Sequence, residues 1–201
     1  MENPKVKAVL FDLDGTVLQI DWDLGYEMKF VREFAARHHI IVENEGINEA
    51  VAEVRFKLKK ERDRKEYLRM LFELEQEMIE KRGVELCPGA KEIVRRVKFA
   101  RIKTAIVSNN FHEHAVMLLD KYGLLEYFDQ VICYDDVLAP KPSPEGILEA
   151  LRRLKVKPQE ALFVGDGRVT DLEAAQAAGV DAVIIDRGKI ASEKERILGR
   201  I

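Results

Sequence analysis

The stretch KAVLFDLDGT, residues 7–16, begins as an apolar run and ends in two acids and a glycine. An unbroken apolar run of this kind is typical of a strand in a parallel sheet that is covered on both faces. Asp12 and Asp14 lie two residues apart, so on a strand their carboxylates would point to the same side. The two charges repel each other unless a cation or a proton shared between them offsets the repulsion. The stretch therefore predicts a buried strand that ends at an acidic site.

Similar β-rich runs recur along the chain and alternate with helical patterns. The runs cover residues 6–11, 102–107, 130–133, 161–164 and 181–185. From residue 89 onward, helical patterns lie between them, near 90–100, 112–122, 144–154, 171–178 and 192–199. This alternation favours a doubly wound, Rossmann-like α/β domain with a parallel sheet. We therefore expect an α/β core made of residues 1–19 and 87–201.

Residues 20–86 differ from the rest, because no convincing strand pattern lies there. Apolar residues fall at helical spacing in three segments: Leu24, Met28, Val31 and Ala35; Ile47, Val51, Val54 and Leu58; and Leu71, Leu74 and Met78. Gly83 predicts the C-terminal stop of the third segment. The charged run KLKKERDRKEY (57–67) is either one exposed helical face, which we favour, or a break between two helices. The segment predicts an inserted α-helical domain.

The composition excludes several classes of protein. The chain has 201 residues, 47% of them apolar, which suffices for a packed core, and its net charge of −3 gives no global attraction to nucleic acid or to acidic membranes. No apolar run predicts a membrane span or a signal peptide. Cys87 and Cys133 lack the spacing of a disulfide framework or a metal site, so we expect two structural thiols. We expect a soluble cytoplasmic protein that binds neither nucleic acid nor membrane; the sequence carries no signal for its oligomeric state.

Four motifs follow the expected strands, and ligands of open α/β sheets bind outside the carboxyl ends of strands. The motifs are DLDGT (12–16), SNN (108–110), PKPSPEG (140–146) and GDGRVTD (165–171). The Asp12 carboxylate can serve as a nucleophile that carries a phosphoryl group. Asp14 can donate a proton to the leaving oxygen and then activate water, and Gly15 allows a sharp turn. The alternative is an acidic turn without chemistry, in which Gly15 is an ordinary turn residue.

The second and third motifs offer donors for a phosphate group. Ser108 could supply a hydroxyl and Asn109 a backbone N–H, although both are also common turn residues. Lys141 lies between Pro140 and Pro142, which stiffen the loop and fix the direction of the ammonium group. That ammonium would neutralise both the phosphate and the nucleophile, whereas the simpler alternative is an exposed lysine.

The fourth motif predicts ligands for a metal ion. Asp12 and Asp166 from different strands, with a phosphate oxygen and waters, would suit octahedral Mg²⁺. Asp171 either belongs to that metal site, directly or through another group, or stabilises a helix start, where the helix dipole favours a negative charge. The second possibility rests on the sequence TDLE (170–173), which predicts a capping box with Thr170 as its N-cap.

Together the motifs resemble the haloacid dehalogenase superfamily, with DLDGT, VSNN, KPSPEG and GDGRVTD as the matching residues. The resemblance covers the α/β core, about two thirds of the chain. The insert 20–86 resembles the helical cap of the phosphoglycolate phosphatase and β-phosphoglucomutase branch, and CPGAKEIVRRV (87–97) resembles the segment that re-enters the core after that cap. One departure is the spacing of five positions between Asp166 and Asp171, where four is frequent in this branch. This spacing leaves open whether Asp171 contacts the metal.

The resemblance implies a role for each matched residue. Asp12 would be the nucleophile that forms an aspartyl-phosphate, and Asp14 the general acid and base. The residues that hold the phosphoryl group would be Ser108, Asn109 and Lys141. The ligands of Mg²⁺ would be Asp12, Asp166 and the backbone carbonyl of Asp14, with Asp171 nearby.

The expected function is Mg²⁺-dependent hydrolysis of a small phosphate monoester, as in phosphoglycolate phosphatases. A phosphomutase of the β-phosphoglucomutase type and a non-catalytic protein that binds a phospho-ligand on the same fold are alternatives. A dehalogenase is disfavoured, because halide departure needs neither a proton donor nor a metal. The expected partner is a small phosphorylated metabolite. Its identity would be set by the insert, where the candidates are His38, His39, Arg55 and Arg62.

Overall fold

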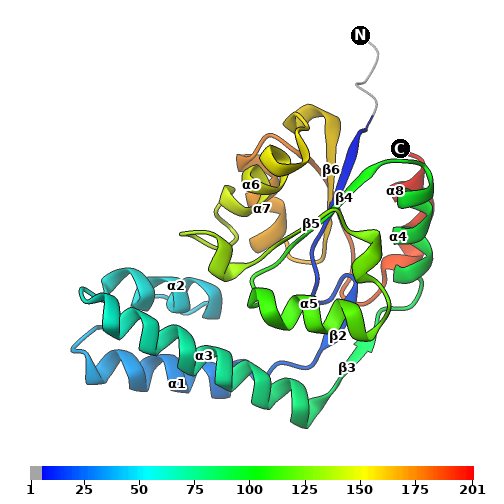
Figure 1. The fold of residues 1–201 in the computed structure, drawn as a ribbon. Helices are drawn as coiled ribbons and strands as arrows, with labels where there is room; N and C mark the ends of the chain where they lie inside the picture. The colour runs from blue at the N-terminus through cyan, green and yellow to red at the C-terminus, as the bar shows by residue number, and fades with distance from the viewer. Residues whose placement is uncertain (1–5) are drawn as a thin grey trace. The chain divides into compact units, whose positions relative to one another are not determined.

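The computed structural model describes residues 6–201, which form two compact units (Figure 1). Unit 1 comprises the chain up to Gln19 together with Glu85–Ile201, and unit 2 comprises Ile20–Val84. Unit 1 is therefore built from two stretches of chain with unit 2 inserted between them. Within residues 6–201, none of the helices combines the length and the apolar character that crossing a bilayer requires.

Five parallel strands form the sheet of unit 1, in the order β5-β4-β1-β6-β7. The strands are β1 Ala8–Phe11, β4 Lys103–Val107, β5 Gln130–Ile132, β6 Ala161–Gly165 and β7 Asp181–Ile184. β1 lies in the centre, where Leu10 is paired with Ala105 of β4 and with Phe163 of β6. All four residues of β1 are buried, because a central strand of a parallel sheet is covered on both faces. The expected α/β fold with a parallel sheet is confirmed.

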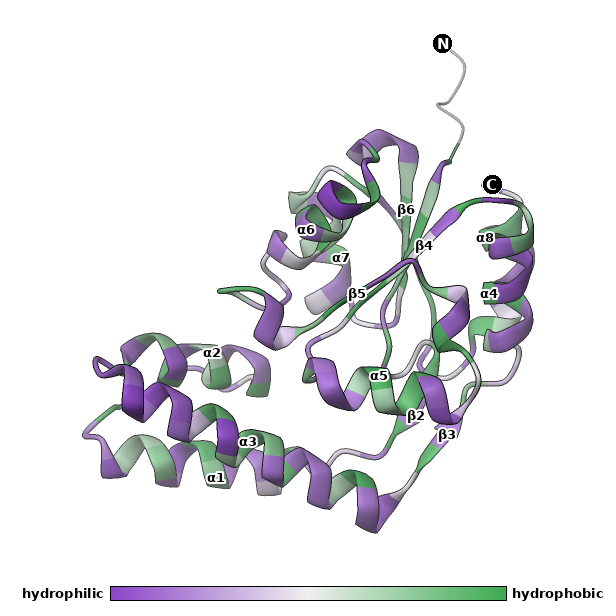
Figure 2. Cartoon of the chain, viewed as in Figure 1, coloured by the Kyte–Doolittle hydropathy of each residue, from purple (hydrophilic) through white to green (hydrophobic). Residues whose placement is uncertain are grey.

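Helices cover both faces of this sheet. They are α4 Ala90–Phe99, α5 His112–Lys121, α6 Glu145–Leu154, α7 Thr170–Ala177 and α8 Lys194–Leu198. Figure 1 shows α6 and α7 on one side of the sheet and α4 and α8 on the other. Apolar side chains of α6 and α7, among them Ile147 and Ala174, pack with Leu10 and Phe163 in one buried cluster. Figure 2 shows the corresponding hydrophobic colouring of β1 and β6.

Short 3₁₀ helices occupy several connections of unit 1. They are η1 Leu125–Tyr127, η2 Tyr134–Asp136, η3 Pro158–Glu160 and η4 Ile190–Glu193. Of these, η2 follows β5 directly and so lies at the carboxyl end of the sheet.

Unit 2 contains the helices α1 Leu24–Arg37, α2 Ile47–Lys57 and α3 Glu61–Arg82. Aromatic side chains lie at its centre: the ring centroid of Phe34 is 4.8 Å from that of Tyr67 and 4.6 Å from that of His38. Such pairs add to the free energy gained by burying apolar area. Gly83, which has φ +79°, ends α3 as expected.

The charged run 57–67 spans a break between two helices. α2 ends at Lys57, and α3 begins at Glu61. Our favoured interpretation of one exposed helical face is therefore wrong. Leu58 explains the break, because its side chain is buried while its backbone is extended and its carbonyl accepts a hydrogen bond from Arg64 Nη1 at 3.0 Å. Burial of this one apolar residue decides the backbone path, which the surrounding charges do not reveal.

Two short strands lie where the chain passes between the units. β2 Leu18–Ile20 and β3 Val84–Leu86 pair with each other in a two-stranded sheet. The sequence indicated no strand within residues 20–86. Three residues are too few to show a period of two, so a pair of strands this short is visible only in the structure.

Candidate active site

The carboxyl ends of β1, β4 and β6 are neighbours in the sheet, and each is followed by a residue predicted for the site. Asp12 follows β1, Ser108 follows β4 and Asp166 follows β6. The backbone N–H of Asp12 donates to the carbonyl of Val164 at 2.8 Å. The hydrogen-bond ladder of the sheet therefore reaches the first acid and fixes its backbone.

Lys141 joins two of the predicted acids. Its Nζ donates to Asp12 Oδ1 and to Asp171 Oδ1, each at 2.6 Å. The side chains of Lys141, Asp12 and Asp171 are only 4%, 7% and 2% exposed, and the ammonium lies 5.5 Å from the centroid of the Phe163 ring. Buried charges persist only when they are paired. Lys141 is therefore a buried partner of two carboxylates, not the exposed lysine of the simpler alternative.

Arg187 joins the other two acids. Its Nη1 donates to Asp166 Oδ2 at 3.0 Å and its Nη2 to Asp14 Oδ2 at 2.9 Å. The side chains of Asp12 and Asp14 therefore pair with separate cations, Lys141 and Arg187, whereas a metal ion held by both residues stays a prediction. The reason for the separate pairing is local: β1 ends before Asp12, and the chain turns at Gly15 with φ +82°, so the two carboxylates do not follow the alternation of an extended strand.

The sequence analysis missed two residues of this site. Arg187 follows β7 by three residues, so the same inspection of strand ends, extended to the fifth strand, would have found it. Thr16 belongs to the DLDGT motif, is buried, and its Oγ1 donates to Asp12 Oδ2 at 3.4 Å. Both signals were present in the sequence.

Two glycines leave room for the carboxylates. A Cβ atom on Gly165, the last residue of β6, would lie 2.4 Å from Asp171 Oδ2. A Cβ atom on Gly15 would lie 2.3 Å from Asp166 Oδ2. Atoms that are not bonded do not approach this closely. The carboxylates of Asp171 and Asp166 can therefore take these positions only because residues 165 and 15 are glycines, which have no Cβ.

Asn109 fixes the backbone of Lys141. Its Nδ2 donates to the carbonyl of Lys141, and its Oδ1 accepts from the N–H of Lys141, both at 2.9 Å. Ser108 is buried, and its Oγ accepts from the N–H of Asn110 at 3.1 Å. The Asn109 side chain thus positions the lysine, while contact of Ser108 and Asn109 with a phosphoryl group stays a prediction.

Asp171 lies in the first turn of α7 and uses both of its oxygens. Oδ1 accepts from Lys141, and Oδ2 accepts from the N–H of Gly167 at 2.8 Å. Thr170 is the first residue of α7, not its N-cap, and the N-cap Val169 makes no side-chain hydrogen bond. The predicted capping box is therefore wrong, because the Asp171 carboxylate, and not the Thr170 hydroxyl, accepts an N–H at the start of this helix.

The cluster holds more negative than positive charge. Among the described residues it contains four carboxylates and two cations: Asp12, Asp14, Asp166 and Asp171, with Lys141 and Arg187. Burial raises the pKa of Asp12 well above its ordinary value; Lys141 opposes this rise, and Asp171 and Asp166 add to it. Burial would lower the pKa of Lys141, but the charges of Asp12 and Asp171 outweigh it and raise that pKa. The difference of two charges equals the charge of one divalent cation.

The same cluster offers a suitable donor set for a metal ion. Asp12, Asp166 and Asp171 each present a carboxylate oxygen, and these atoms lie within 4.8 Å of one another. Burial raises the pKa of Asp166 although Arg187 opposes the rise, so this carboxylate too would gain from an added cation. Oxygen-only donor sets suit hard cations such as Mg²⁺. The residues therefore fit the ion that the sequence predicts.

Two of the specificity candidates of the insert, His38 and Arg62, contact other residues of unit 2. The ring of His38 stacks on Phe34, and its Nδ1 lies 3.8 Å from Asp63 Oδ2. Arg62 Nε lies 3.4 Å from Asp63 Oδ1. These contacts support a structural role for His38 and Arg62, and a role in substrate selection stays a prediction.

The chain belongs to the haloacid dehalogenase-like hydrolase family, whose model matches residues 6–179. A relative from Caldanaerobacter subterraneus subsp. tengcongensis, provisionally named the pyrophosphatase PpaX, is 31% identical over 90% of this chain and 82% of its own length. A phosphoglycolate phosphatase from Nitrosospira multiformis is 29% identical over 91% of this chain and 84% of its own length. The predicted family and the predicted class of enzyme, a hydrolase, are confirmed.

Solved structures agree with this assignment. A haloacid dehalogenase-type phosphatase from Thermococcus onnurineus is 27% identical, covers 98% of this chain and 100% of its own, and has a TM-score of 0.64. A structure from Lactobacillus plantarum, assigned as a phosphoglycolate phosphatase, has a TM-score of 0.68 at 22% identity and covers 98% of this chain and 100% of its own. The second likeness concerns the fold alone.

Proposed function

We propose that the chain is a Mg²⁺-dependent phosphatase that hydrolyses a small organic phosphate monoester through an aspartyl-phosphate. The observation that carries the proposal is the buried ammonium of Lys141, which lies 2.6 Å from carboxylate oxygens of both Asp12 and Asp171. Transfer of a phosphoryl group gains more from positioning and charge than from covalent assistance. A preformed cluster of acids and fixed cations is suited to that task.

The metal ion would be held by Asp12 and Asp166, together with the backbone carbonyl of Asp14. When bound, Mg²⁺ would supply positive charge to the phosphate oxygens. Asp171 has one oxygen on Lys141 and the other on the Gly167 N–H. We therefore propose that Asp171 acts on the metal site mainly by holding Lys141.

Asp12 is the proposed nucleophile. One of its carboxylate oxygens attacks phosphorus, the bond from phosphorus to the ester oxygen breaks, and its electron pair leaves with that oxygen, which takes a proton from Asp14. Water then attacks the phosphorus, gives its proton to Asp14, and the bond between Asp12 and phosphorus breaks to release phosphate. Lys141, which already neutralises Asp12, would also balance the charge of the phosphoryl group, with Ser108 and Asn109 as its further donors.

The relatives narrow the class of substrate. Several of them are named phosphoglycolate phosphatases, so phosphoglycolate and other small phosphorylated metabolites are the first compounds to test. We propose that unit 2, Ile20–Val84, is the cap that selects among these metabolites. These bounds replace the range 20–86 expected from the sequence. A phosphomutase would give a rearranged phosphate ester instead of free phosphate.

The test is release of inorganic phosphate from a panel of phosphorylated metabolites, with Mg²⁺ and with EDTA. We expect turnover that needs Mg²⁺, and we expect Asp12→Asn to lower it by at least about 10³-fold, as removal of other catalytic nucleophiles does. The variant keeps the shape of the side chain, so its melting temperature with and without Mg²⁺ serves as a control for folding. Turnover of Asp12→Asn close to that of the native protein would exclude Asp12 as the nucleophile.

A further inference from the structure

Three metal-ligating side chains meet in unit 1 outside the carboxylate cluster. His112, Cys133 and Asp136 each offer a ligand atom, and the three atoms lie within 4.8 Å of one another. We propose that they form a second metal site, which binds Zn²⁺ through one nitrogen, one sulfur and one oxygen and keeps a fourth position open. No pattern in the sequence indicates it, because the first ligand lies 21 residues before the second.

The backbone around these ligands is already fixed. His112 is the first residue of α5, and Asp136 is the last residue of η2. The N–H of His112 donates to Asp135 Oδ1 at 2.8 Å, and the N–H of Tyr134 donates to the carbonyl of Asn110 at 3.1 Å. These bonds join the turn before α5 to the turn after β5, so the three ligands do not have to be brought together from separate flexible loops.

Cys133 has the surroundings of a metal-binding thiolate. Its side chain is buried, and its sulfur accepts a hydrogen bond from the N–H of Asp136. Hydrogen bonds to the charged form of a group favour that form, and the thiolate is the form that binds metals. The N–H of Cys133 in turn donates to Asp136 Oδ2 at 2.9 Å, which orients the carboxylate beside the sulfur.

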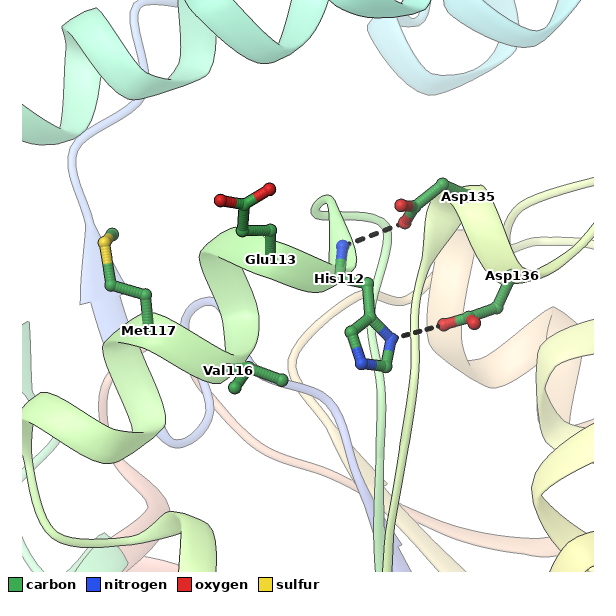
Figure 3. Close-up of a pocket in the computed structure, with 6 residues that line it drawn as sticks. All are labelled: His112, Glu113, Val116, Met117, Asp135 and Asp136. Carbon is green, nitrogen blue, oxygen red and sulfur yellow. Dashed lines mark hydrogen bonds and ion pairs between the residues drawn. The ribbon is translucent and has the colours of Figure 1, made fainter.

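His112 and Asp136 are in direct contact. The distance from His112 Nδ1 to Asp136 Oδ2 is 2.7 Å (Figure 3). Zinc bonds to nitrogen and oxygen are about 2.0–2.1 Å long, so a tetrahedral ion would separate these two atoms to roughly 3.3 Å. A change of this size needs only a small rotation of side chains, and 40% of the His112 side chain is exposed, which leaves room for it.

A pocket adjoins this site. Its volume is about 630 Å³, and His112 and Asp136 form part of its lining together with Glu113, Val116, Met117 and Asp135 (Figure 3). An ion held between His112 and Asp136 would therefore face the pocket. Three protein ligands with an open fourth position are the arrangement of zinc sites that exchange a water or another ligand.

The two clusters differ in the metals that they should accept. Thiolate and imidazole ligands suit Zn²⁺, whereas Mg²⁺ prefers oxygen ligands in octahedral geometry. The cluster of Asp12, Asp166 and Asp171 consists of oxygens alone. Mg²⁺ in excess should therefore fill the carboxylate cluster and leave the second site to Zn²⁺ or to Co²⁺, its usual spectroscopic substitute.

The experiment is a titration of metal-free, reduced protein with Co²⁺ in the presence of excess Mg²⁺. We expect the absorption band of a cobalt–thiolate bond to saturate at one equivalent and to disappear when Zn²⁺ is added. Cys133→Ser should lose the band and bind Zn²⁺ on the order of 100-fold more weakly. Replacing a residue that only contacts a metal ligand already weakens metal binding by about 10-fold to 100-fold, and loss of a ligand itself should cost at least as much. The matched control is Cys87→Ser, the other buried cysteine, which should keep both properties.

His112→Gln keeps the proposal testable if Cys133→Ser does not fold. His112 is partly exposed, so its replacement removes a ligand without opening the core. It should weaken Zn²⁺ binding by a similar factor. Zinc should also raise the melting temperature of the native protein and of Cys87→Ser, but not of the two ligand variants. Absence of the band, its loss in Cys87→Ser, or equal stabilisation of all four proteins by zinc would overturn the proposal.

Discussion

The ammonium of Lys141 and the guanidinium of Arg187 each hold two carboxylates, but with different geometry. Lys141 is a single charged atom between Asp12 and Asp171, each 2.6 Å away. Arg187 uses two nitrogens of one planar group, one for Asp166 and one for Asp14. A planar fork fixes direction as well as distance, which a lysine does not. We therefore infer that Arg187 acts as a positioning residue for Asp14 and Asp166.

Replacement of Arg187 tests this inference. Arg187→Gln should lower kcat/KM by about 10-fold to 100-fold, because a carboxylate displaced by about 1 Å can lose 100-fold in rate. Arg187→Lys should recover only part of the loss, since one ammonium cannot match both bonds of the fork. Steady-state kinetics, together with melting curves in a Mg²⁺ series, measure both effects.

A suitable control is Arg196→Gln, because the Arg196 side chain is 52% exposed and forms its ion pair with Glu193, outside the carboxylate cluster. It should leave the kinetics unchanged. If Arg187→Lys were as active as the native protein, the fork would not matter and charge alone would account for Arg187.

Among the elements, the end of β6 and the start of α7 together determine the position of the Asp171 carboxylate. Gly165 ends the strand, and Asp171 lies in the first turn of the helix, with its Oδ2 on the Gly167 N–H. Because a Cβ on Gly165 would lie 2.4 Å from that oxygen, the packing of strand against helix leaves no spare room. The Asp171 carboxylate can accept the hydrogen bond from Lys141 only while the connection from β6 to α7 keeps this conformation.

Gly165→Ala should therefore damage the site without straining the backbone. The added methyl group would displace the Asp171 carboxylate and loosen Lys141, and we expect kcat to fall at least about tenfold, with a loss of about 1–3 kcal/mol in stability, as for other overpacked sites. Phosphate release and denaturant unfolding measure the two effects. Gly25→Ala is the control, because its Cβ would meet its nearest atom at an ordinary 3.5 Å; an equal loss in that variant would contradict the argument.

The sequence predicted the strands, their parallel arrangement and the acids at their ends, because apolar runs and strand-end residues are local signals. It also predicted that Lys141 would neutralise Asp12, but it did not predict that Lys141 pairs with Asp171, or Arg187 with Asp14 and Asp166. Arg187 reaches Asp14 across 173 positions of the chain. Such pairs follow from the order of the strands in the sheet, which no local pattern records. The capping box at Thr170 was wrongly predicted for the same reason. The Asp171 carboxylate accepts a hydrogen bond from Lys141, which is distant in sequence, as well as acting at the start of its own helix.

At the scale of the whole molecule, unit 2 carries a carboxyl group whose charge opposes folding. Burial and the neighbouring charge of Glu75 raise the pKa of Glu27 to about 8. The folded state therefore holds a proton that the unfolded state releases near its ordinary value. By linkage, this contribution to stability is fully present below about pH 4.5 and is lost as the pH rises from there through about 8.

Glu27→Gln should remove this dependence. The amide cannot ionise, so the melting temperature of the variant should fall less between pH 5 and pH 9 than that of the native protein, and it should be the higher of the two at the alkaline end. Melting curves over this range measure the difference. Glu33→Gln, an exposed change on the same helix, is the control, and the prediction fails if both variants follow the native profile.

The central position of β1 has a consequence for the order in which the protein can fold during synthesis. β1 is made before both of its partners in the sheet, because β4 and β6 begin only at Lys103 and Ala161. At about 5–20 residues per second, the ribosome needs roughly 8–30 s to go from the end of β1 to the end of β6. Meanwhile the helices of unit 2 can pack on one another, as Phe34 of α1 packs on Tyr67 of α3. β1 must therefore stay without its sheet partners, and needs protection from other strand edges, until β4 and β6 have been made.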